Sequence, residues 1–312
     1  MRTKNAGIRG AALLCTLAIL TSCTGAGGSA AGAPAELPPG AATVLGSGTL
    51  YLDAGNGAFS TNLWRIDLPS GQATQLTHNP EQDGISNFSA SPAGLVMGDA
   101  ASSVDVLDRL WDGKAIQIGD GSGDDPVINN AGQIAYELDP PDLHTGLFRI
   151  LLRDSIAAPP HTVFRESRFD NLSVLSWSPD RQELLIAESP DSEAYTKYVA
   201  VTSQGRMLWQ ITLGGPVALV NWENVGLSIG NGTFNPGPNE ILSLSGRVKY
   251  TIPGGWEPFC WNPAGTEMIV FRHPRELGLW RLSAPGRVQD LGALPLGGLL
   301  ECQWLSRPAA GT

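Results

Sequence analysis

The sequence predicts an all-β fold built from repeated sheets, and three observations lead to this expectation. Short apolar runs alternate along the chain with turns rich in glycine and proline. A motif that contains tryptophan recurs at nearly constant spacing, and a second motif follows it at a fixed distance. No helical stripe of apolar residues is visible after residue 23.

Composition limits the classes of function. The chain has 312 residues, of which 42% are hydrophobic, so it can bury a sizeable core. Only 16% are charged, and the formal net charge is −10. Because nucleic acids are held mainly through basic contacts to phosphates, we expect no nucleic-acid partner.

Residues 1–22 have the features of an export signal. Three basic residues precede the apolar run 11–20, which is too short to cross a bilayer as a helix. The end of the leader, Leu20 to Cys23, resembles the bacterial lipobox, in which the cysteine is lipidated and becomes the first residue. The resemblance implies a lipoprotein that carries palmitate-type chains on Cys23 and is anchored to the cell membrane on its extracytoplasmic side. An ordinary secretory signal with a coincidental cysteine is the alternative.

The segment after the leader is predicted to be a tether. Residues 24–42 are almost wholly Gly, Ala, Ser, Thr and Pro, a composition that buries little apolar area. We therefore expect residues 23–42 to form the lipidated cysteine and a flexible tether, and residues 43–308 to fold. Removal of the leader would leave 17 basic and 30 acidic residues, a formal charge of −13.

A tryptophan motif divides the folded part into repeats. In its fullest copies a short strand ends in tryptophan, a turn of Pro, Asn, Asp or Gly follows, and an apolar strand comes next. The equivalent positions, spaced 39, 48, 45, 39 and 43 residues apart, are Ala90, Asn129, Trp177, Trp222, Trp261 and Trp304. This spacing suits a propeller blade of four strands, which takes about 40–45 residues. Recurrence at one blade position favours packing between blades over a platform that stacks on sugars.

A second motif marks the third strand of a blade. It reads Leu-Trp-Arg or Leu-Phe-Arg and begins at Leu63, Leu147 and Leu279. In the last two copies its leucine lies 18 residues after the tryptophan-equivalent position. The chain ends are complementary, because only eight residues follow Trp304 while residues 48–77 lack an innermost strand. The sequence therefore predicts a six-bladed β-propeller, closed by pairing of the C-terminal strand with the N-terminal blade.

These motifs resemble the TolB-like, WD-like repeat of bacterial envelope proteins. The residues that carry the resemblance are Trp177 to Asp180, Leu63 to Asp67 and Gln75 to Thr77, and it covers about residues 45–305. It implies the propeller fold and leaves function open, because one fold hosts many activities. A tether stands where TolB has an N-terminal α/β domain, so the role of TolB itself is not implied.

Two cysteines remain in the predicted exported domain. Cys260 and Cys302 lie one and two residues before Trp261 and Trp304, on innermost strands of neighbouring blades. A disulfide between them would lock the ring. Two buried free thiols and a metal site are the alternatives, although no histidine has ligand spacing to either cysteine. We expect no metal and no cofactor.

Acidic residues precede the predicted innermost strands. Since these positions all open onto one face of a propeller, we expect them to form a negative rim suited to a cationic peptide or a cation. Solvated loop acids are the alternative. The six residues are Asp83, Asp124, Asp125, Asp170, Glu257 and Glu301.

Two functions are compatible with the sequence. The first is a monomeric, membrane-tethered module that binds an envelope protein or peptide. The alternative is an extracytoplasmic propeller enzyme, a glycan hydrolase or lyase that uses two channel carboxylates about 5–9.5 Å apart. We identify no catalytic residue, so an enzyme is the less favoured expectation.

Overall fold

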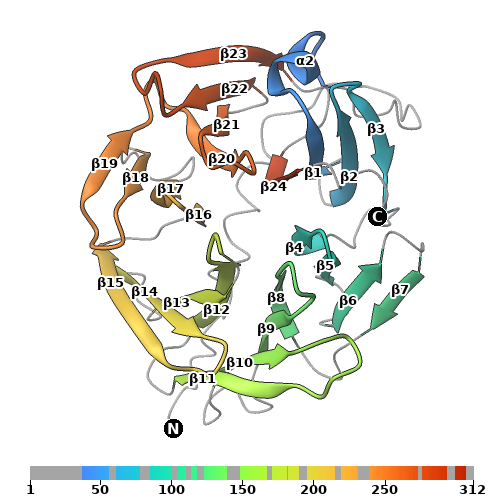
Figure 1. Ribbon diagram of the computed structural model, residues 1–312, viewed down its shortest axis with the longest axis vertical. Coiled ribbons are helices and arrows are strands. Elements are labelled where there is room, and N and C mark those ends of the chain that lie inside the picture. Colours follow the sequence, from blue (N-terminus) through green and yellow to red (C-terminus); the bar gives the residue numbers. More distant parts are fainter. Residues whose placement is uncertain are drawn as a thin grey trace, which may run out of the picture. The chain divides into compact units, whose positions relative to one another are not determined.

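The computed structural model describes most of the predicted folded domain. The chain divides into two compact units, Met1–Ala33 and Pro34–Thr312, and all described residues belong to the second. Apart from one short helix, they form antiparallel β-sheets around a common centre (Figure 1). The predicted all-β propeller is confirmed. The described residues are 37–55, 61–77, 85–99, 104–109, 114–117, 123–138, 148–166, 171–180, 182–189, 195–214, 219–230, 239–272, 276–293 and 299–306.

The described strands form six sheets of four strands each. From the centre outward, one sheet contains β24 (Leu299–Leu305), β1 (Gly48–Gly55), β2 (Thr61–Leu68) and β3 (Gln72–Gln75). The next two contain β4 (Ile85–Ser91), β5 (Gly94–Asp99), β6 (Val104–Arg109) and β7 (Lys114–Gln117), and β8 (Gly123–Ile128), β9 (Ile134–Leu138), β10 (Phe148–Arg153) and β11 (His161–Glu166).

The other three sheets follow the same order. They contain β12 (Asn171–Trp177), β13 (Glu183–Ser189), β14 (Tyr195–Thr202) and β15 (Met207–Gly214); β16 (Leu219–Glu223), β17 (Gly226–Gly230), β18 (Glu240–Leu242) and β19 (Val248–Thr251); and β20 (Glu257–Trp261), β21 (Glu267–Arg272), β22 (Glu276–Arg281) and β23 (Val288–Ala293). In each sheet the first strand named lies nearest the centre (Figure 1).

The two sequence motifs occupy the predicted strands. The six tryptophan-equivalent positions lie on innermost strands or directly after one, and all six residues are buried. Leu63 lies on β2 and Leu279 on β22, each the third strand of its sheet, while Leu147 lies outside the described residues. The spacing of the tryptophan motif therefore located the innermost strands correctly, and the second motif located the third strand of the sheets that contain Leu63 and Leu279.

One sheet joins the two ends of the chain. β24 pairs antiparallel with β1, with Leu50 opposite Trp304 and Asp53 opposite Glu301. On either side of this sheet, β24 contacts the innermost strands β20 and β4. The last strand therefore supplies the inner edge that the first three strands lack.

The repeated tryptophans pack between neighbouring sheets. The indole N–H of Trp177 donates to the backbone carbonyl of Val127 at 3.3 Å, and that of Trp261 donates to Ser228 Oγ at 3.2 Å. Trp222 packs edge-to-face against Trp209, with ring centroids 5.2 Å apart. A buried indole usually finds a partner for its N–H, and the partners of Trp177 and Trp261 lie on the preceding sheet.

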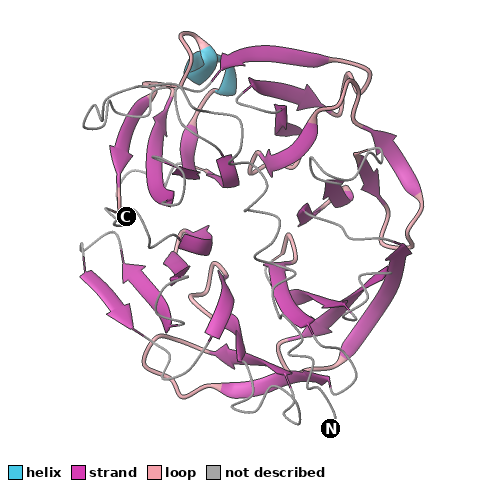
Figure 2. Cartoon of the chain, turned by 180° about the vertical axis from the view of Figure 1, so that it is seen from behind, coloured by secondary structure: helices cyan, strands magenta, loops and turns pink. Residues whose placement is uncertain are grey.

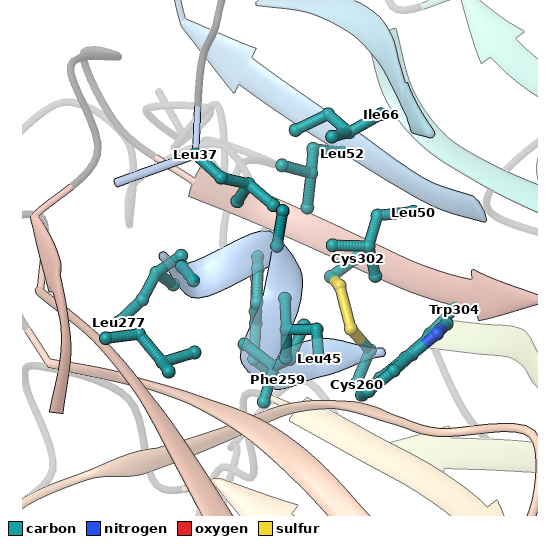
Figure 3. Close-up of a cluster of buried hydrophobic side chains, with 14 of the residues drawn as sticks. Leu37, Leu45, Leu50, Leu52, Ile66, Phe259, Cys260, Leu277, Cys302 and Trp304 are labelled. Carbon is teal, nitrogen blue, oxygen red and sulfur yellow. A yellow bond between two sulfur atoms is a disulfide. The ribbon is translucent and has the colours of Figure 1, made fainter. Parts of the chain in front are cut away.

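A disulfide ties β20 to β24. Cys260 and Cys302 are bonded and buried, in a cluster that includes Leu50, Phe259 and Trp304 (Figure 3). The bond therefore lies in a hydrophobic seam between two sheets. For the 42 residues that separate the cysteines, loop-closure entropy corresponds to a stabilisation of about 4 kcal/mol.

The boundary of the folded part differs from the expected one. The tether was expected to extend to residue 42, yet Leu37 is buried and a helix, α2 (Ala41–Leu45), follows it (Figure 2). Leu37 and Leu45 insert into the same cluster as the disulfide (Figure 3). The tether prediction rested on average composition and missed Leu37, which anchors the end of the segment in the core. Within the described residues, no helix has the length and apolar character needed to cross a bilayer.

Replacing Trp177 by phenylalanine tests the hydrogen bond that its indole N–H donates to the neighbouring sheet. We expect Trp177→Phe to lower the free energy of unfolding by about 1–3 kcal/mol more than Trp304→Phe does. Both variants lose the same ring volume, but only Trp177 donates to a carbonyl, since Trp304 Nε1 has no hydrogen-bond partner in the part of the chain that the structure describes. Urea unfolding measures the difference, and equal losses would contradict the role assigned to the bond.

Candidate functional site

The predicted acidic rim is assembled only in part. Asp125 and Glu301 come together where the innermost strands β8 and β24 begin, and Glu257 begins the innermost strand β20. Asp83, Asp170 and the side chain of Asp124 lie outside the described residues. The site therefore centres on the junction of three sheets, those of β24, β4 and β8.

Asp53 belongs to this junction and was missed by the sequence analysis. It lies on β1 directly opposite Glu301, and it is only 1% exposed. Motif spacing predicted that β1 and the last strand pair but carried no information on register, and register alone places this aspartate beside the glutamate. We refer to Asp53, Asp125 and Glu301 as the carboxyl cluster.

Side chains of β24 hold the backbone of β4. Glu301 Oε2 accepts a hydrogen bond from the N–H of Phe88 at 2.8 Å. Two residues further on, Gln303 Oε1 accepts from the N–H of Ala90 at 2.6 Å, and Gln303 Nε2 donates to the carbonyl of Phe88 at 3.3 Å. These bonds satisfy backbone groups that an innermost strand otherwise leaves open. Glu301 is therefore a structural residue as well as a rim acid.

A second set of bonds joins β4 to β8. Asn87 Nδ2 donates to Asp125 Oδ1 at 3.2 Å, and Ser89 Oγ accepts from the N–H of Ile128 at 3.1 Å. Asp125 has a φ of 52°, a left-handed conformation that is uncommon for residues other than glycine. The turned backbone and the bond from Asn87 fix its carboxylate at the junction.

The electrostatics of the junction are set by Glu301. Burial of its carboxyl raises the pKa to about 8; the N–H of Phe88 lowers it, and the negative charges of Asp53 and Asp125 raise it. Near neutral pH this carboxyl is therefore mostly protonated. The acidic rim consequently carries less negative charge than the number of its acidic residues suggests.

The carboxyl cluster is not arranged as a metal centre. Within the described residues, no group of three or more His, Cys, Asp and Glu side chains has a geometry that could hold a metal ion. A carboxyl that is neutral near pH 7 beside two other carboxyls can release its proton, and the carboxylate that remains can pair with a cationic group.

Two hollows lie at the other ends of the innermost strands. One, of about 440 Å³, borders the sheet of β24 and includes Tyr51, Arg65 and Asp67 in its wall. The second, of about 420 Å³, lies by the turn after β12 and includes Asp180, Glu183 and Trp222 among its lining residues. Neither hollow contains a residue of the carboxyl cluster, so the site described above is a separate feature.

The raised pKa of Glu301 predicts a pH-dependent stability. Its ordinary pKa is 4.5 and its folded value is about 8, so the folded protein keeps a proton that the unfolded chain releases between these pH values. The free energy of unfolding should therefore fall as pH rises from 4.5 to 8, by at most about 1.4 kcal/mol per pH unit.

Glu301→Gln isolates this effect, because glutamine still accepts from Phe88 but does not titrate. We expect urea unfolding between pH 5 and 9 to show a flatter profile for this variant. Asp154→Asn, at an exposed acid, serves as the control and should keep the wild-type slope. Parallel profiles for Glu301→Gln and wild type would contradict the assignment.

Comparison with known proteins identifies the fold. No family model matches the chain, and no curated protein matches it. Among solved structures, one of a nidogen/laminin complex is 15% identical, with a TM-score of 0.58, and the match covers 83% of this chain and 98% of that one. A putative TolB from Agrobacterium tumefaciens is 14% identical with a TM-score of 0.54, covering 84% and 99%. The tricorn protease is 12% identical with a TM-score of 0.54, covering 77% of this chain but only 29% of that one. At these identities the similarity concerns the fold alone: this chain has a β-propeller fold, and the putative TolB is among the solved structures that share it.

Proposed function

We propose that this protein is a lipoprotein anchored through Cys23 on the extracytoplasmic side of the cell membrane, and that its propeller is a binding module for an envelope protein or peptide. The leader and its terminal cysteine support the anchor. The six sheets, with β24 paired to β1, act in this proposal as six blades of one closed ring. Such a ring is a rigid scaffold that presents its loops to a partner.

One observation carries the proposal of binding over catalysis. The repeated tryptophans are buried between sheets, with exposures of 2% for Trp177 and 6% for Trp222 and Trp304. They therefore pack the seams and offer no stacking surface beside the carboxyl cluster. A glycan-cleaving channel is expected to combine paired acids with aromatic walls, and these aromatic residues are used elsewhere.

The proposed contact surface is the acidic mouth, with Asp125, Glu257 and Glu301 as its described members. A cationic segment of the partner would place a positive charge near Glu301, and that charge would favour loss of its proton. The partner would thus increase the negative charge of the site that binds it. Among the similar structures, the nidogen/laminin complex contains a propeller fold within a protein assembly, in line with a binding role.

One feature favours the alternative, a glycan hydrolase or lyase. A glutamic acid that stays protonated near neutral pH beside other carboxyls is the arrangement that glycosidases use. However, Asp53 is almost completely buried, and Glu301 Oε2 is occupied by the N–H of Phe88. These contacts assign the cluster to the joint between sheets more than to a substrate channel.

The anchor is tested by Cys23→Ser. We expect the wild-type protein to fractionate with membranes and to be extracted only by detergent, because two or more acyl chains give stable anchoring. The variant should lose this association, and metabolic labelling with a palmitate analogue should disappear with it. Cys15→Ser, within the leader, is the matched control and should be labelled normally. Labelling of the Cys23→Ser variant would contradict the proposal.

Affinity capture from the native envelope after mild cross-linking tests the binding role. We expect one reproducible partner by mass spectrometry, with recovery reduced at least about tenfold in the triple variant Asp125→Asn, Glu257→Gln, Glu301→Gln, because the charge complementarity is lost. The control triple variant, Asp154→Asn, Glu276→Gln, Asp290→Asn, removes three acids that are not part of the mouth. Equal recovery with both triple variants would refute the acidic mouth as the contact surface. Turnover in glycan or peptide screens, lost on Glu301→Gln, would favour the enzyme.

A further inference from the structure

The hollow beside the sheet of β24 has no role in the proposed function. It has a volume of about 440 Å³, which suits one small molecule. Residues of β1, of β2 and of the turn after β2 form most of its wall, and Pro92, from the turn after β4, closes it on the side of the next sheet. It lies at the end of the innermost strands away from the carboxyl cluster, so it can bind a ligand separately.

The phenol of Tyr51 lies in this wall without a hydrogen-bond partner. Tyr51 is only 3% exposed, and within the described residues its hydroxyl makes no hydrogen bond. Burial raises its pKa, while the positive charge of Arg65 lowers it and the negative charge of Asp67 raises it, so the hydroxyl lies within reach of both charges. A buried hydroxyl without a hydrogen bond is unfavourable, and a polar ligand in the hollow would supply the missing bond.

Arg65 has unused hydrogen-bonding capacity at the same place. A guanidinium group carries five N–H donors, yet in the part of the chain that the structure describes this side chain makes one polar contact, to Asp67 Oδ2 at 3.4 Å. Its Nε is buried without a partner. Arg281 holds the same place in another copy of the motif, and it donates to Glu267 at 2.6 Å and to Gln289 at 2.8 Å. The free donors of Arg65 therefore fit the oxygens of an anionic group.

Asp67 adds the opposite charge directly beside Arg65. The two residues are two positions apart on β2 and so lie on the same face of the sheet. The 3.4 Å between Arg65 Nη2 and Asp67 Oδ2 is long for a charge-assisted hydrogen bond, and both side chains are partly exposed, so their mutual attraction is weak. A ligand with a carboxylate and an ammonium group on one carbon can pair with both. Such a ligand is neutral overall, so the net charge of −10 on the chain does not oppose its entry.

The remaining wall of the hollow is largely apolar. Leu68, Pro69, Pro92 and Leu305 lie around the charged pair. The seam between these two sheets also lacks the tryptophan that packs other seams, because Ala90 stands at the equivalent position. An apolar side chain of a ligand would therefore find apolar contacts next to the charged pair.

We propose that this hollow binds a free α-amino acid with an apolar side chain. Arg65 pairs with its carboxylate, Asp67 accepts from its ammonium group, and the hydroxyl of Tyr51 donates to the carboxylate. The apolar side chain packs against Pro92 and Leu305. Because both charged groups of the amino acid take part, residues within a peptide and at its ends are excluded. This inference goes beyond the proposed function and does not depend on it.

Isothermal titration calorimetry of the full-length chain tests the class of ligand. The probes are L-leucine, L-isoleucine and L-phenylalanine, and we expect at least one to bind with a Kd below about 1 mM. The N-acetylated form and the amide of that amino acid each lose one charge, so each should bind at least about tenfold more weakly. If none of the three probes binds with a Kd below about 1 mM, the proposal is wrong. An N-acetylated form that binds as tightly as the free amino acid would also overturn it, because Asp67 would then have no role.

Substitutions in the wall of the hollow test the assigned contacts. Arg65→Gln and Asp67→Asn each remove one charge, and we expect each to raise the Kd at least about tenfold. Tyr51→Phe keeps the ring and removes the hydroxyl, and it should raise the Kd about threefold to tenfold. Arg149→Gln is the matched control, because Arg149 holds the same motif position in another sheet and does not line the hollow.

Urea unfolding of each variant shows that the protein used in the titration is folded. An unchanged Kd with Arg65→Gln, or an equal loss with Arg65→Gln and Arg149→Gln, would contradict the inference. The titration does not depend on capture at the acidic mouth, so the two proposals can fail separately.

Discussion

The structure depends on the antiparallel pairing of β24 with β1. This pairing gives the first three strands their inner edge and places Trp304 against Leu50 in the core. It also sets Glu301 beside Asp53 and brings Cys302 within bonding distance of Cys260. The candidate site therefore exists only because β24 pairs with β1. Any change that weakens this pairing alters the fold and the site together.

The architecture could be predicted because the tryptophan motif recurs at nearly constant spacing along the chain. Spacing of the tryptophan motif located innermost strands, and the fixed offset to Leu279 located the third strand of a sheet. The site could be predicted only in part. The sequence identified acidic residues by their position before the innermost strands, but it did not show which side chains contact one another. Asp53 is specified by register, and the anchoring of Leu37 and α2 is specified by tertiary packing, neither of which leaves a periodic signal.

One position on the innermost strands performs the same task with different chemistry. The residue before the tryptophan-equivalent position reaches the next sheet through a hydroxyl at Ser89, an amide at Asn221 and Gln303, and a sulfur at Cys260. In these repeats the side chain at this position points toward the next sheet, although the residue type differs from one repeat to another. Ser176 occupies the equivalent place in another sheet, where its buried Oγ has no hydrogen-bond partner among the described residues.

The joining of distant segments in one sheet also imposes an order on folding. Five of the six sheets consist of contiguous stretches of chain, so each can form once its own four strands are available. The sheet of β1 cannot be completed until β24, some 250 residues later on the chain, has been synthesised. Cys260 likewise has to persist as a thiol until Cys302 is available. The disulfide can thus form only after β24 has been synthesised, so an oxidised Cys260–Cys302 pair reports that both strands of this joint are present.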